Sequence, residues 1–69
     1  MANKYKVIDE LNVNSNKVLV LNKPRDVEDY DTSNIIVNGE KHHYLITHNE
    51  NWIIVKNGNS FIGEEIEFR

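Results

Sequence analysis

Short apolar segments separated by turn-forming residue pairs are the feature that most constrains what this chain can fold into. Asn38-Gly39 and Asn57-Gly58 are both Asn-Gly pairs, and each follows an apolar run. A type I′ turn needs positive φ at its two central residues, which asparagine and glycine tolerate best. The sequence therefore predicts a β-hairpin turn at each pair.

Alternation of apolar and polar residues predicts strands between the turns, because successive strand residues point to opposite faces. Asn14-Ser15-Asn16 and residues 48–51 are further turn candidates. The expected strands cover residues 4–13, 17–21, 35–37, 41–48, 52–56 and 61–68. No long segment carries an apolar stripe at helical spacing, so the sequence predicts an all-β fold.

The phase of the alternation predicts which side chains face the core. The predicted core-facing residues of the first strand are Tyr5, Val7, Leu11 and Val13, and those of the last strand are Ile62, Ile66 and Phe68. Segment 17–21 is apolar in both phases, which is typical of a strand covered on both sides.

Length and composition limit the architecture. The chain has 69 residues and no cysteine, so neither disulfides nor cysteine-based metal or thiol chemistry is available. Strands separated by frequent turns favour a sandwich or a barrel, and closure into a barrel removes unpaired strand edges. We therefore predict that residues 1–69 form a single domain, a small closed or partly closed antiparallel β-barrel of about six strands.

The sequence also predicts a cytoplasmic protein without membrane contact. No apolar run approaches the roughly 18 residues needed to cross a bilayer. Residues 1–6 lack the apolar stretch of a secretory signal.

Both ends of the chain resemble a known barrel. Residues 5–13 are similar to the first strand of the second domain of translation elongation factors. Residues 60–68 are similar to the closing strand of that barrel, which has an aliphatic-Gly-polar-polar-aliphatic pattern. The resemblance covers nearly the whole chain and implies a fold only. The Gly-rich segment of the factors is replaced here by residues 14–17, and the chain contains no GTP-binding domain, so no tRNA contact is carried over.

The histidines do not predict a metal site. His42 and His43 are consecutive and should point to opposite faces of a strand, while His48 lies about 20 Å along the same strand if it is straight. Exposed strand histidines are the favoured interpretation, and no cofactor or metal is expected.

The acidic segment 26–31 has two interpretations. Residues 29–40 place oxygen ligands at spacings that resemble an EF-hand calcium loop, but Asn34 stands where glycine is expected, and flanking helices are not predicted. A solvated connection after Pro24 is the favoured interpretation. No nucleophile-elbow or Gly-rich phosphate motif is present, so the sequence predicts no catalytic residue and no enzyme.

A basic patch is the candidate binding site. If the first two strands form a hairpin, the side chains of Lys4, Lys6, Lys23 and Arg25 gather at its far end. Small nucleic-acid-binding barrels use such patches. The alternative is an ordinary soluble strand face with lysines that protect an edge, which the adjacent acidic segment favours.

These observations predict a non-catalytic module that binds a protein partner, with RNA binding through the basic patch as the alternative. The net charge of −3 does not favour a general nucleic-acid binder. Trp52 and Tyr44 are expected to fill the core, since their exposure would instead mark a protein-binding patch. Self-association is open between a monomer and a weak homodimer.

Overall fold

The computed structural model describes residues 3–69, which form seven strands and one 3-10 turn. The strands are β1 (Lys4–Val13), β2 (Asn16–Leu21), β3 (Asn34–Val37), β4 (Glu40–His43), β5 (Leu45–Ile46), β6 (Trp52–Lys56) and β7 (Glu65–Phe68). The turn η1 (Val27–Asp29) lies in the connection between β2 and β3. The all-β prediction is confirmed, and within the described residues no helix is long and apolar enough to span a bilayer.

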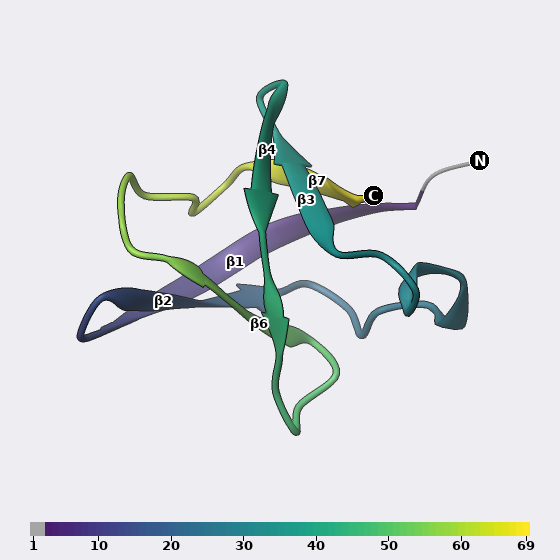
Figure 1. Ribbon diagram of the computed structural model, residues 1–69, viewed down its shortest axis with the longest axis horizontal. Helices are drawn as coiled ribbons and strands as arrows, with labels where there is room; N and C mark the ends of the chain where they lie inside the picture. The colour runs from purple at the N-terminus through teal and green to yellow at the C-terminus, as the bar shows by residue number, and fades with distance from the viewer. Residues whose placement is uncertain (1–2) are drawn as a thin grey trace.

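All strands belong to one antiparallel sheet in the order β4-β3-β7-β1-β2-β6-β5. Figure 1 shows β1 as the long purple strand that passes through the molecule. Its first residues pair with β7, and from Val7 onward it pairs with β2. The strand therefore joins the two parts of the sheet.

The structure has seven strands rather than about six because the expected strand 41–48 is divided. β4 pairs with β3, whereas β5 pairs with β6, and only Tyr44 separates β4 from β5 in the chain. These two strands are also the edges of the sheet, so the ladder of paired strands is open between them.

The predicted face of the first strand is wrong after Val7, because the strand contains a β-bulge. The pairing of β1 with β2 shifts between Val7 and Asp9. One extra residue reverses the alternation that follows it. Tyr5 and Val7 are buried as predicted, whereas Leu11 and Val13 lie on the opposite, exposed face.

Only one of the two Asn-Gly pairs forms the predicted hairpin. Asn38 and Gly39 have φ values of 52° and 81° and join β3 to β4. Asn57-Gly58 begins a long loop instead, because the chain after it turns away from β6 and pairs with β1 and β3 as β7. Ile62 lies in this loop and is exposed, so its predicted core position is wrong.

One cluster of buried side chains fills the interior. It contains Tyr5, Val7, Leu19, Leu21, Ile35, Val37, Tyr44, Ile53, Val55, Phe61, Ile66 and Phe68. The ring of Phe68 makes edge-on contacts with Tyr5 and Tyr44, at centroid distances of 5.1 and 5.0 Å. The core prediction for Tyr44 is confirmed, whereas Trp52 stays 37% exposed.

Candidate functional site

The four residues of the predicted basic patch lie in two kinds of surroundings. Lys4 and Lys6 are exposed on β1, and their partners across the strand pair are Glu67 and Glu65 on β7. Opposite charges at facing positions attract each other. The surface around the two lysines therefore carries both positive and negative charges.

The other two basic residues stack on tyrosines. Lys23 Nζ lies 4.8 Å from the centroid of the Tyr5 ring, and the Arg25 guanidinium lies 5.0 Å from that of Tyr30. The Lys6 backbone N–H donates to the Asn22 side-chain Oδ1, and the Asn22 backbone N–H donates to the Lys6 carbonyl oxygen, so Lys6 lies at the same end of the hairpin as Lys23. The structure thus brings Lys6 and Lys23 to one end of the hairpin, where Lys6 is opposite Glu65 in the strand pair and the Lys23 ammonium lies over the Tyr5 ring.

Tyr5 binds the acidic segment 26–31 through its hydroxyl group. Its hydroxyl donates to Asp29 Oδ2 at 2.8 Å and accepts from the Asp26 backbone N–H at 2.7 Å. Burial, with a further contribution from Asp29, raises the pKa of Tyr5 to about 12, although the bond from Asp26 opposes the shift. Asp29 is buried in this contact rather than directed into solvent.

The three histidines occupy different surroundings. His42 is half-buried with its ring 5.3 Å from that of Phe61, and its Nε2 atom lies 3.8 Å from Glu40 Oε2. His43 is exposed, and His48 lies in the loop after β5 rather than in the same strand. In the part of the chain that the structure describes, no three His, Asp or Glu side chains are grouped to hold a metal ion.

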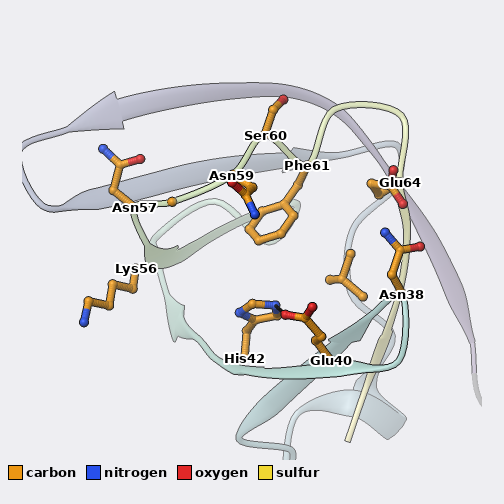
Figure 2. Close-up of a pocket in the computed structure, with 11 residues that line it drawn as sticks. Asn38, Glu40, His42, Lys56, Asn57, Asn59, Ser60, Phe61 and Glu64 are labelled. Carbon is orange, nitrogen blue, oxygen red and sulfur yellow. Dashed lines mark ion pairs between the residues drawn. The ribbon is translucent and has the colours of Figure 1, made fainter.

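A pocket of about 320 Å³ opens between the β3–β4 turn and the loop that follows β6. Figure 2 shows His42, Glu40 and Phe61 at its walls, with the Lys56 side chain directed away from it. Its lining hydroxyl, Ser60, donates to Glu10 and not to His42. Ser60 and His42 therefore do not form a nucleophile-base pair, because such a pair requires a hydrogen bond between the hydroxyl and the base.

One lysine is buried, which was not expected from the sequence. Lys17 is 3% exposed, and its Nζ donates to the carbonyl oxygens of Gly58 and Asn59 at 3.2 and 2.7 Å. It also forms an ion pair with Glu10. The signal was present in the alternation, because Lys17 shares its phase with the buried Leu19 and Leu21. The ammonium group fixes the long loop against the β1–β2 hairpin.

The outward side of β1, β2, β6 and β5 carries an apolar surface. Leu11 faces Val18, Val18 faces Ile54, and Ile54 faces Leu45, so one row crosses four strands. Leu11 and Leu45 are 51% and 56% exposed. We call this surface the outer apolar face, and it consists of Leu11, Val13, Val18, Val20, Leu45, Trp52 and Ile54.

This face explains why segment 17–21 is apolar in both phases. Leu19 and Leu21 point into the core, whereas Val18 and Val20 point outward and are only half-buried. The predicted cover on the second side is not supplied by the described chain. A groove of about 570 Å³ borders the face, and its lining includes Leu45 and Ile54 together with Lys41, His43 and Lys56.

No protein-family model, curated protein or solved structure matches the chain.

Proposed function

We propose that the protein is a non-catalytic interaction module that binds a protein partner through the outer apolar face. The observation that carries this proposal is the row Leu11–Val18–Ile54–Leu45, which crosses four strands without a charged residue. Contiguous exposed apolar surface of this kind is typical of protein-binding sites. Trp52 adds a half-exposed aromatic side chain, the residue type that often dominates binding energy.

The arrangement of charges supports a protein rather than an RNA partner. Lys4 and Lys6 each face a glutamate, and Glu65 and Glu67 reduce the positive potential that a phosphate backbone would require.

The proposal also includes a partly closed barrel in the cytoplasm. β4 and β5 are consecutive in the chain, and β4 contacts β6 across the open side of the ladder. This curvature places apolar side chains inside and leaves the opposite side of β2 and β6 exposed. Similarity to the translation-factor barrel is part of the same architectural proposal.

The test compares two variants that add the same charge. Leu11→Glu changes the outer apolar face, whereas Val27→Glu changes η1, where Val27 is 75% exposed. Proteins that copurify with the tagged wild type would be identified, purified and titrated against each variant by calorimetry. We expect Leu11→Glu to abolish binding and Val27→Glu to retain it. Equal binding by wild type and Leu11→Glu, with folding confirmed by circular dichroism, would contradict the proposal.

A further inference from the structure

Two charged residues, Asp9 on β1 and Lys56 on β6, flank the outer apolar face. Among the residues in register on β1, β2 and β6 on this side, two are charged, and they have opposite signs. Asp9 on β1 is paired with Val20, and Lys56 on β6 is paired with Asn16, so both lie on the same face of the sheet on either side of β2. Both are exposed, and Figure 2 shows Lys56 extending away from the pocket.

Val18 lies midway between these two charges. Asp9 is displaced from Val18 by one strand toward β1 and by two residues toward Val20. Lys56 is displaced by one strand toward β6 and by two residues toward Asn16, in the opposite direction. A two-fold axis that lies in the plane of the face, passes through Val18 and is perpendicular to the line between the two charges therefore exchanges their positions.

We infer that the partner of the outer apolar face is a second copy of this chain, packed face to face about a two-fold axis at Val18. This inference rests on the proposed function and names its partner. In the dimer, Asp9 of each copy meets Lys56 of the other, which gives two ion pairs related by symmetry. Such a self-complementary surface is the requirement for a two-fold interface.

The apolar side chains supply the contact between the two charge pairs. Val18 packs on its own symmetry copy, with Leu11 and Ile54 on either side of it in the row. Two sheets packed in this way interdigitate their side chains about 10 Å apart. Strand β2 would then be covered on both sides, by the core over Leu19 and Leu21 and by the second copy over Val18 and Val20, as the two apolar phases of segment 17–21 predict.

The dimer is expected to be weak. About ten residues per copy make an interface at the small end of the known range, and each copy carries a net charge of −3. We expect a dissociation constant on the order of 10⁻⁵ M, so that monomer and dimer exchange within accessible concentrations.

Sedimentation equilibrium of the purified chain between about 1 µM and 1 mM tests the inference. The wild type should show a monomer-dimer equilibrium. Asp9→Lys and Lys56→Asp should each weaken the dimer by about tenfold or more, because each places like charges together twice. The double variant Asp9→Lys/Lys56→Asp should restore the wild-type constant, and Val27→Glu should leave it unchanged.

The charge exchange distinguishes this geometry from a dimer formed through any other surface. A chain that stays monomeric at 1 mM overturns the inference, as does a dimer that neither single charge variant weakens or that the double variant fails to restore. The proposed function fails separately, when Leu11→Glu changes neither self-association nor the binding of any copurified protein. A monomeric chain whose purified heterologous partner is lost on Leu11→Glu would keep the proposed function and reject the homodimer.

Discussion

The Nζ atom of Lys17 lies 3.1 Å from Glu10 Oε2, in a site where the lysine side chain is 3% exposed and the glutamate side chain 12%. Glu10 also accepts hydrogen bonds from the Ser60 hydroxyl and the Phe61 backbone N–H. The pair connects the β1–β2 hairpin to a loop more than 40 residues later in the chain. These contacts hold the loop that begins at Asn57-Gly58, where the sequence predicted a hairpin turn.

Removing the lysine charge should destabilise the fold strongly. Lys17→Met leaves the Glu10 carboxylate poorly hydrated and without its cation, and breaking a buried pair in this way costs about 3 kcal/mol or more. The double variant Lys17→Met/Glu10→Gln removes both charges, so its loss of unfolding free energy should be smaller than that of Lys17→Met alone. Urea denaturation measures both, and a double variant less stable than the single one would contradict the account.

The same site should make stability depend on pH. Burial alone would raise the pKa of Glu10, but the bonds from Ser60, Lys17 and Phe61 outweigh it and lower the pKa below the ordinary value of 4.5. Because the folded pKa is below the unfolded one, this stabilisation is complete above about pH 4.5 and is lost as pH falls through the folded value. Glu10→Gln should lower stability at neutral pH and flatten this acid-side slope, as measured by urea denaturation from pH 2 to 7. An unchanged slope would show that other carboxyl groups cause it.

Tyr5 should titrate at a pH well above the ordinary tyrosine range. Its pKa is raised to about 12 from 10, chiefly by burial. A raised folded pKa means that the stabilisation is present below pH 10 and is lost as pH rises toward 12. Ultraviolet absorbance during an alkaline titration should show a late tyrosine step that Tyr5→Phe removes. Tyr5→Phe should also destabilise the protein by about 1–3 kcal/mol, because it leaves Asp29 and the Asp26 N–H without their buried partner.

Most strands were predictable from the sequence because local alternation and turn chemistry decide them, although the expected strand 41–48 is divided and the expected strand 61–68 begins at Glu65. Which face the side chains of β1 take after Val7 was not predictable, because a bulge adds one residue without changing the composition of the strand. Asn57-Gly58 forms a loop rather than a hairpin turn because β7 pairs with β1 and β3, which are distant in sequence. Local residue preferences do not indicate which distant strands will pair.

The candidate site was less predictable than the fold. The sequence placed Lys6 and Lys23 at one end of a hairpin, but it did not reveal Glu65 and Glu67 beside the lysines, because that contact joins opposite ends of the chain. The outer apolar face had a visible signal in the two apolar phases of segment 17–21. The proposed cover of the outward-facing side chains is a second copy of the chain, and it follows from the positions of Asp9 and Lys56 in the sheet rather than from the alternation.

The two Asn-Gly pairs provide a matched test of backbone conformation. Gly39 has a φ of 81°, whereas Gly58 lies outside the left-handed region, and a Cβ atom would have open space at either position. Gly39→Ala should therefore lower the unfolding free energy by about 1–2 kcal/mol through strain alone. Gly58→Ala should leave it unchanged or raise it by up to about 1 kcal/mol, because the unfolded chain loses freedom. Thermal or urea unfolding of the two variants side by side measures the difference, and equal destabilisation would mean that both pairs form the same turn.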